Sequence, residues 1–205
     1  GHVRLGLEVH YDAEVDEGSA AALAAAMGGH DLALAMLTPG AHAHYAYGGP
    51  ASLDDDELAS ARDFGRRTLE LAYGPLRPAW HGERSLAPTL VLWNGSYGYD
   101  LATLAVAEMY RRLKESIADL CRREKDAGGE LYIAIEPKPN EGHPAMLLPT
   151  VASVLLFWRR LAEGYDVSLD RKGVNKEFGH SEMIGLDHVY DTVEEIDCGG
   201  LVHMH

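Results

Sequence analysis

The chain has 205 residues, of which 46% are hydrophobic and 24% charged, so it is long and apolar enough to bury one sizeable core. Its formal net charge of −14, without a block of lysine or arginine, argues against a nucleic-acid partner, because phosphate binding requires a basic face. No apolar run approaches the ~20 residues that cross a bilayer, and no signal-peptide pattern is visible. Cys121 and Cys198 lack the spacing of a metal or disulfide motif. Together these features predict a soluble cytoplasmic protein.

Six short runs rich in Val, Ile or Leu alternate along the chain with longer helical patterns. Each run is bounded by Gly, Pro, Asp or Asn, which is typical of buried strands in a parallel sheet built from βαβ units. The predicted strands are Leu5 to His10, Leu32 to Leu37, Thr89 to Trp93, Leu131 to Glu136, Gly173 to Glu177 and Leu201 to His205.

Helices are predicted in the intervals between these runs. Ser52 and Asp55 have the spacing of a capping box ahead of an apolar stripe, which indicates a helix N-terminus. The predicted helices cover Glu17 to Met27, the residues that follow Ser52, Leu101 to Ala127, Thr150 to Glu163 and Asp187 to Ile196.

This alternation fits both a doubly wound sheet and a TIM barrel. No glycine-rich phosphate-binding motif follows the first strand, whereas nearly every predicted strand ends in a chemically functional side chain. These side chains are His10, Trp93, Glu136, Glu177 and His205. Because TIM barrels collect their chemistry from the carboxyl ends of many strands, the sequence favours an α/β fold of the (β/α) TIM-barrel type. We expect a single domain over residues 1–205 with about six β/α units, fewer than the eight of a closed barrel.

Two segments carry candidate metal ligands. Glu136 and Lys138 are two residues apart in an extended segment, so both point to the same side, either as a buried ion pair or as a metal ligand beside a cation. Glu177 and His180 follow the fifth predicted strand. Carboxylate and imidazole together suit Mn²⁺, Co²⁺ or Mg²⁺ better than structural zinc, which favours thiolates.

Other histidines and one tryptophan could contribute to the same site. His203 and His205 alternate on the last strand and face one side, as a ligand pair or as the polar end of a core strand. His10 closes the first strand and is followed by acidic residues, which could make an acid–base cluster or a solvated surface. His44 could line a sugar-sized pocket, and Trp93 offers a flat face for a sugar ring, although an aromatic residue here is also common in cores.

Several segments resemble the xylose isomerase family and its sugar-isomerase relatives. The family's fifth strand and the helix after it are similar to IEPKPNE and LLPTVASVLLFWRRL, and its N-x-E-x-x-H motif is similar to GVNKEFGHSEMIGL. Less closely, WNGSYGYD and VHYDAE resemble the family's tryptophan motif and its H-D-D-D segment. The strong similarity covers roughly Tyr132 to Leu186.

The resemblance implies an aldose–ketose isomerase that uses divalent metal ions, with Mn²⁺, Mg²⁺ or Co²⁺ as the cofactor. By position in the family motifs, Glu136 would bind the first metal, Glu177 would bridge two metals and His180 would bind the second. At His205 the family has an aspartate, whereas rhamnose isomerases and tagatose-type epimerases have a metal-binding histidine there. This departure implies a sugar substrate other than xylose.

Further roles and departures follow from the same resemblance. Lys138 would hydrogen-bond the carbonyl oxygen of the substrate, Trp93 would wall the pocket, and His10 would assist ring opening. The family's aspartate partner of His10 is replaced by Ala13. The family's first strand, its later D-x-D pair and its eighth-strand carboxylate have no counterpart in these 205 residues, so we expect little isomerase activity from them alone.

Two alternatives remain open from the sequence. One is a single-metal sugar epimerase in which Glu136 and a second acid shuttle a proton. The other is a non-catalytic partial barrel that self-assembles, since the strands Leu5 to His10 and Leu201 to His205 would be unprotected edges. The open edges predict a homodimer or a higher homo-oligomer, most simply with two-fold symmetry.

Overall fold

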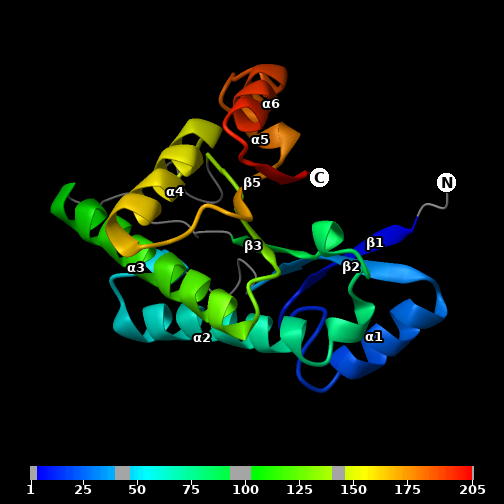
Figure 1. Cartoon of the computed structure of the whole chain (residues 1–205). Coiled ribbons are helices and arrows are strands. Elements are labelled where there is room, and N and C mark those ends of the chain that lie inside the picture. Colours follow the sequence, from blue (N-terminus) through cyan, green and yellow to red (C-terminus); the bar gives the residue numbers. More distant parts are fainter. Residues whose placement is uncertain (1–3, 40–46, 93–102, 140–145, 205) are drawn as a thin grey trace.

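One sheet of six parallel strands organises the computed structural model, which describes residues 4–39, 47–92, 103–139 and 146–204. The strands pair in sequence order and the sheet curls into an open half-barrel (Figure 1). They are β1 (Leu5–His10), β2 (Leu32–Thr38), β3 (Thr89–Leu92), β4 (Tyr132–Ile135), β5 (Lys172–Lys176) and β6 (Leu201–Met204). The predicted incomplete (β/α) barrel of TIM type is therefore confirmed, and each predicted strand lies within a residue or so of an observed one.

Helices alternate with the strands and cover one face of the sheet (Figure 1). They are α1 (Ala20–Gly29), α2 (Asp55–Tyr73), α3 (Thr103–Ala127), α4 (Val151–Tyr165), α5 (Phe178–Glu182) and α6 (His188–Asp197). The sequence predicted all of them except α5, which is too short to show a helical period. In the described part of the chain, no helix combines the length and the apolarity needed to cross a membrane.

The capping box predicted at Ser52 is wrong. Asp54 is the N-cap of α2, and its carboxylate accepts hydrogen bonds from the backbone N–H groups of Asp56 and Glu57 at 3.0 and 2.9 Å. The hydroxyl of Ser52 instead accepts from the Asp54 N–H at 3.1 Å. A charged carboxylate is the stronger acceptor for the unpaired N–H groups of a first helical turn, so the cap lies two residues later than expected.

The two faces of the sheet differ in character. Strand side chains on the helix side join the helices in a single large core, with Leu34, Leu90, Ile133 and Val174 from the strands and Met27, Leu69, Leu113 and Phe157 from the helices. Among the described residues, the apolar cluster on the concave side is small and consists of Met36, Val91 and Ala134, against which Val202 packs. The remainder of the concave side is therefore available to polar side chains at the strand ends.

Two irregularities in strand register place polar residues on this concave side. Between β5 and β6 the register shifts after Val174, so that Asn175 lies opposite His203. Between β1 and β2 it shifts after Leu7, so that Glu8 lies opposite Met36 of the concave cluster. An extra residue in one strand re-aims the side chains that follow it, and here it brings residues of β1, β5 and β6 to one face.

β5 and β6 approach each other very closely at Gly173. A Cβ atom at this position would lie 2.1 Å from the carbonyl oxygen of Gly200 and 2.7 Å from Cγ2 of Val202. Only glycine allows such an approach between backbones, so Gly173 is a requirement of the β5–β6 pairing.

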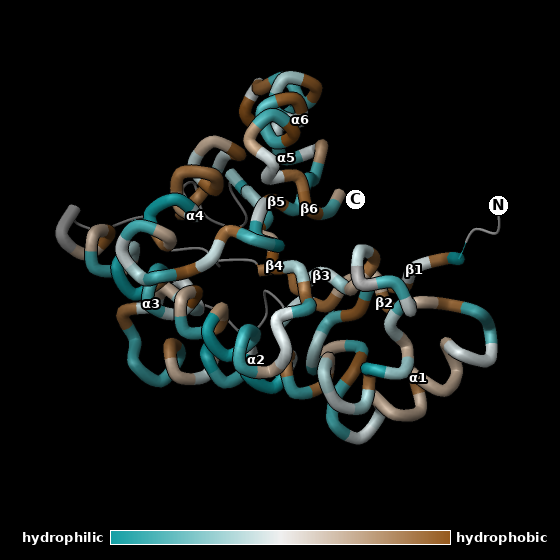
Figure 2. Tube along the Cα trace, viewed as in Figure 1, coloured by the Kyte–Doolittle hydropathy of each residue, from teal (hydrophilic) through white to brown (hydrophobic). Residues whose placement is uncertain are grey.

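Helix α6 presents its apolar side chains outward. Val189, Val193 and Ile196 are 60%, 47% and 59% exposed, whereas Asp191 and Glu195 are buried. Figure 2 shows the same mixture of hydrophobic and hydrophilic residues on α6, at the periphery of the molecule. A surface helix normally buries its apolar stripe, so the inward carboxylates of α6 must have a polar partner beneath them.

Candidate functional site

A chain of hydrogen bonds connects the ends of β4, β5 and β6 on the concave side. The Glu136 carboxylate, just beyond β4, accepts a hydrogen bond from Nδ2 of Asn175 at 2.9 Å. The Oδ1 atom of Asn175 lies 2.8 Å from Nδ1 of His203. With Nδ2 donating to Glu136, the Oδ1 atom of Asn175 faces His203 and can only accept, so Nδ1 of His203 is the donor and carries the proton.

This network also fixes which nitrogen of His203 remains basic. With the proton on Nδ1, the lone pair is on Nε2, which lies 3.7 Å from Oε1 of Glu8. A protonated His203 would thus form an ion pair with Glu8, from the first strand to the last across the concave side. The curl of the sheet is what brings β1 and β6 within reach of each other.

His180 lies on α5, directly after β5, and turns back toward Glu136. Its Nδ1 atom is 3.1 Å from the carbonyl oxygen of Pro137 and 3.5 Å from Oε1 of Glu136. Burial lowers the pKa of His180 most, and Lys138 lowers it further, while the carboxylates of Glu136 and Glu177 oppose the change. A neutral imidazole that donates from Nδ1 to Pro137 keeps its lone pair on Nε2, the protonation state that a metal ligand requires.

Glu177 is the N-cap of α5. Its Oε1 atom accepts a hydrogen bond from the backbone N–H of Gly179 at 3.0 Å, which holds the carboxylate at the first turn of the helix. Glu136, Glu177 and Lys138 all lie close enough to His180 for their charges to shift its pKa. The four predicted residues Glu136, Lys138, Glu177 and His180 therefore lie in one region.

His10 has a carboxylate partner, although Ala13 replaces the residue that the resemblance assigns to that role. Oε2 of Glu14 lies 2.9 Å from Nδ1 of His10 and also accepts from the His10 backbone N–H at 2.8 Å. These two hydrogen bonds lower the pKa of Glu14. His10 is thus hydrogen-bonded to Glu14, one residue beyond Ala13, and its part in an acid–base cluster stays a prediction.

The donor chemistry of this region suits a divalent cation, because Glu136 offers carboxylate oxygens and His180 an imidazole nitrogen. Over the residues that the structure describes, however, no three or more His, Cys, Asp or Glu side chains are arranged to hold a metal ion. Three predicted site residues, His44, Trp93 and His205, lie outside the described residues. Glu136 and His180 are therefore the two candidate ligands that the described structure places side by side.

Sequence reasoning missed Asn175 and Glu8, and it considered His203 only beside His205, as a ligand pair or as the polar end of a core strand. Asn175 belongs to the quoted N-x-E-x-x-H segment, so a signal was present, but its partners depend on the β5–β6 register. Glu8 carried no such signal, because its contact with His203 exists only in the curled sheet.

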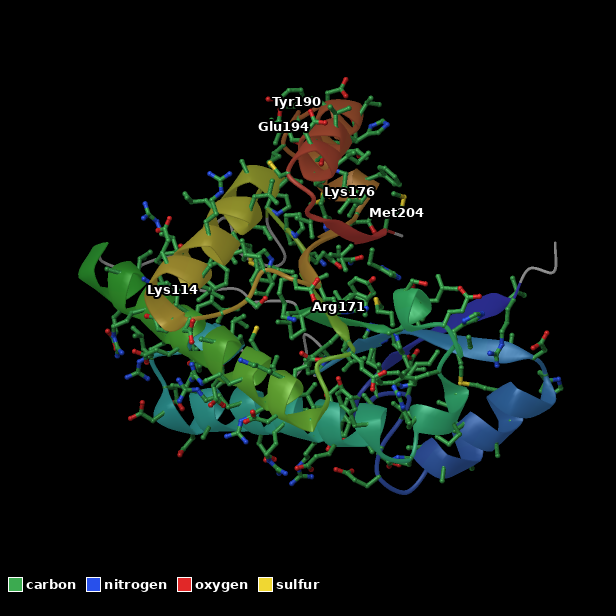
Figure 3. The ribbon with its side chains drawn as sticks, in the orientation of Figure 1. Lys114, Arg171, Lys176, Tyr190, Glu194 and Met204 are labelled. Carbon is green, nitrogen blue, oxygen red and sulfur yellow. The ribbon has the colours of Figure 1, made fainter. Side chains whose placement is uncertain are left out.

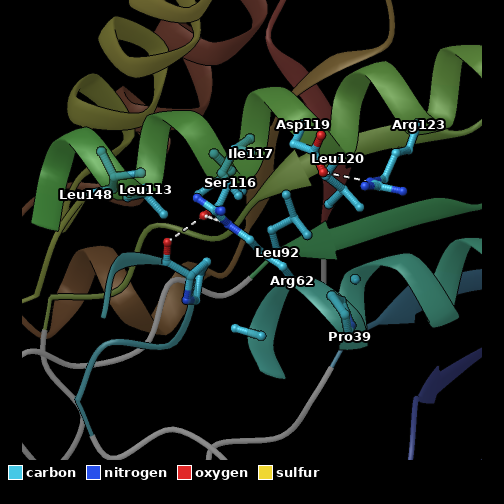
Figure 4. A pocket seen from close by; sticks show the side chains of 14 residues that line it. Pro39, Arg62, Leu92, Leu113, Ser116, Ile117, Asp119, Leu120, Arg123 and Leu148 are labelled. Carbon is cyan, nitrogen blue, oxygen red and sulfur yellow. Dashed lines mark hydrogen bonds and ion pairs between the residues drawn. The ribbon is translucent and has the colours of Figure 1, made fainter. Parts of the chain in front are cut away.

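A separate pocket lies between α2 and α3, on the helix side of the sheet (Figure 4). Its lining is mostly apolar, and its charged groups are already paired. Arg62 donates to the Ser116 hydroxyl at 3.0 Å and Arg123 to Asp119 at 2.6 Å. No predicted site residue lines this pocket, which distinguishes it from the cluster around Glu136.

No protein-family model matches the chain. Solved structures with the same fold include a D-tagatose 3-epimerase-like protein, with a TM-score of 0.71 and 16% identity, over 100% of this chain and 67% of that one. A D-psicose 3-epimerase solved in the presence of D-fructose gives a TM-score of 0.65 at 17% identity, over 98% and 62% of the two chains.

A xylose isomerase domain protein from Planctomyces limnophilus gives a TM-score of 0.64 at 12% identity, over 98% of this chain and 71% of that one. The chain thus spans roughly two thirds of the length of these proteins. The resemblance read from the sequence is confirmed at the level of the fold, which is that of the xylose isomerase-like TIM-barrel sugar epimerases and isomerases.

Proposed function

We propose, from the fold that this chain shares with sugar epimerases and xylose isomerase-like proteins, that it carries part of the site of a metal-dependent aldose–ketose sugar isomerase. The observation that carries the proposal is the gathering of Glu136, Lys138, Glu177 and His180 at the carboxyl ends of β4 and β5. This is the end of a (β/α) barrel at which catalytic residues collect.

Mn²⁺, Mg²⁺ or Co²⁺ would be held by Glu136, Glu177 and His180, with His205 as a further ligand. Such an ion, when bound, polarises the oxygen atoms of a sugar. The donors are prepared for this role by their neighbours. Asn175 orients Glu136, and the Pro137 carbonyl orients the neutral imidazole of His180.

The remaining residues would act on the sugar itself. Lys138 would donate a hydrogen bond to the substrate's carbonyl oxygen and stabilise negative charge there. His10, held by Glu14, would accept the proton of the ring hydroxyl as the ring opens. His44 and Trp93 would line the pocket.

A single-metal epimerase is the second candidate, and two of the three similar structures described above are named as epimerases or epimerase-like. The two reactions differ in how hydrogen moves. A hydride shift keeps a label from C2 in the sugar, whereas proton transfer through a carboxylate releases it to water. Release of the label to solvent would favour the epimerase.

Metal binding is the direct test. We expect the chelator-treated protein to bind Mn²⁺ in calorimetry, and Glu136→Gln and Glu177→Gln each to weaken the affinity by about 10-fold or more, since even residues that only orient ligands contribute that much. Glu163→Gln, on the exposed end of α4, is the control and should leave the affinity unchanged. A wild-type protein that binds no Mn²⁺ would contradict the proposed cofactor, and an unaffected Glu177→Gln variant would remove Glu177 from the ligand set.

We further propose that the chain self-associates as a homodimer or a higher homo-oligomer. β1 and β6 are the two ends of the sheet, and the outward side chains Val189, Val193 and Ile196 of α6 lie in the same part of the molecule as β6. Light scattering at micromolar concentration should give a mass of at least twice 22.3 kDa. A well-folded monomer would contradict the proposal.

A further inference from the structure

A buried cluster of charged and polar side chains lies directly behind the candidate site. Lys176 is fully buried, and because side chains alternate along β5, it points to the helix side while Asn175 and Glu177 point to the site. Its ammonium donates to the Ser181 hydroxyl at 2.7 Å and lies 3.6 Å from Asp191 and 3.8 Å from Glu195. Figure 3 shows Lys176 next to α5, with Tyr190 and Glu194 on the outer part of α6.

The cluster holds one ammonium, that of Lys176, and two carboxyl groups, those of Asp191 and Glu195, so its charges balance when one carboxyl group is protonated. Asp191 accepts a hydrogen bond from the Ser181 hydroxyl at 2.6 Å, whereas neither oxygen of the buried Glu195 has a hydrogen-bond partner among the described residues. Burial raises the pKa of Glu195 to about 7, although Lys176 opposes the change. Below that pH the ammonium of Lys176 therefore balances Asp191 alone.

The same cluster explains the inverted orientation of α6. Asp191 and Glu195 face inward because Lys176 lies beneath them, and this turns the apolar residues of α6 outward. A buried ion pair is often no more stabilising than apolar side chains of the same size, but its hydrogen bonds fix one arrangement. Lys176 and its partners thus contribute mainly by fixing the orientation of α6 against β5.

The residues that the cluster orients are neighbours of the site residues in the sequence. Lys176 immediately precedes Glu177, and Ser181 immediately follows His180. The helix α5 between them has only five residues, too few to be stable without tertiary contacts. Its fixed points are Glu177 at the N-terminus and Ser181 held between Lys176 and Asp191.

We propose that Lys176, Ser181 and Asp191 are positioning residues that lock α5 against α6 and so aim His180 and Glu177 into the site. This inference rests on the proposed function only in treating Glu177 and His180 as site residues. Loss of the contacts among Lys176, Ser181 and Asp191 should free α5 from α6, and the Nδ1 atom of His180 should then lose its hydrogen bond to Pro137.

The test is a pair of matched substitutions on one strand. Lys176→Met removes the lock, and Lys172→Met removes a second buried lysine at the opposite end of β5, where it lies 3.7 Å from Glu124. Nitrogen-15 NMR of the His180 imidazole reports its tautomer without any metal. In the full chain we expect the wild type and Lys172→Met to keep the proton on Nδ1, and Lys176→Met to shift the population toward Nε2–H.

Ser181→Ala provides a second variant in case Lys176→Met does not fold, because it breaks the lock without leaving a charge unpaired. It should shift the tautomer in the same direction and weaken Mn²⁺ binding by about 10-fold, as expected when a group that orients a ligand is lost. An unchanged His180 tautomer in Ser181→Ala, or an equal shift in Lys172→Met, would overturn the proposal. If the wild type binds no Mn²⁺ while Lys176→Met and Ser181→Ala still show these tautomer shifts, only the proposed function is contradicted.

Discussion

Replacing Phe157 with alanine should lower the free energy of unfolding by about 3–5 kcal/mol, as measured by urea denaturation. Phe157 is fully buried on the inner face of α4. Its ring centroid lies 5.9 Å from that of Tyr110 on α3 and 6.2 Å from that of Trp158, so the substitution leaves a cavity between two helices.

The adjacent residue supplies the control. Leu156 is 51% exposed on the same helix, and Leu156→Ala should change the free energy of unfolding by no more than about 0.5 kcal/mol. Equal effects of the two substitutions would mean that α4 does not pack through its Phe157 face.

A comparable loss, about 3–5 kcal/mol, is expected for Glu124→Ala at the amino end of β4 and β5. The Glu124 carboxylate is almost fully buried, accepts from the Tyr73 hydroxyl at 2.7 Å and from the Leu131 N–H at 3.0 Å, and lies 3.7 Å from Lys172. Its removal takes the carboxylate partner from the Lys172 ammonium and leaves the Leu131 N–H with only its longer contact, 3.3 Å, to the Tyr73 hydroxyl.

Denaturant unfolding of Glu115→Ala is the matched control, since Glu115 also lies on α3 but forms a partly exposed ion pair with Arg111. It should change the free energy of unfolding by at most about 1 kcal/mol. If Glu124→Ala proved as mild as its control, the carboxylate would not be the acceptor that joins α2 to the start of β4.

β2, β3 and β4 were predictable because strands buried on both faces require apolar runs, and such runs are visible without any knowledge of contacts. The sequence was a poorer guide to where a helix begins when several side chains could accept the hydrogen bonds of its first turn. Asp54 and Ser52 could both begin a helix, and only the backbone conformation shows that Asp54 does so. Helix α5 has only five residues and carries no helical period, and the contact of Ser181 with Asp191 on α6 is not visible in its local sequence.

The positions of the candidate site residues were predictable in part, because a parallel sheet brings the carboxyl ends of its strands to one edge. Glu136, Glu177 and His180 follow strand ends, so the architecture alone brings them together. The links through Asn175 and His203 depend on an extra residue in β6, and the approach of Glu8 depends on the curvature of the whole sheet. Neither register nor curvature is encoded by the spacing of side chains along one segment.

The close approach at Gly173 sets a limit on how this protein can vary. Any side chain there would meet the Gly200 carbonyl, a backbone atom that cannot move without separating β5 from β6. In a library of all single substitutions, position 173 should therefore accept none, while Gly28 and Gly29, which have open space around them, should accept many. The pairing of β5 with β6 that aligns Asn175 with His203 therefore constrains which sequences can keep this fold.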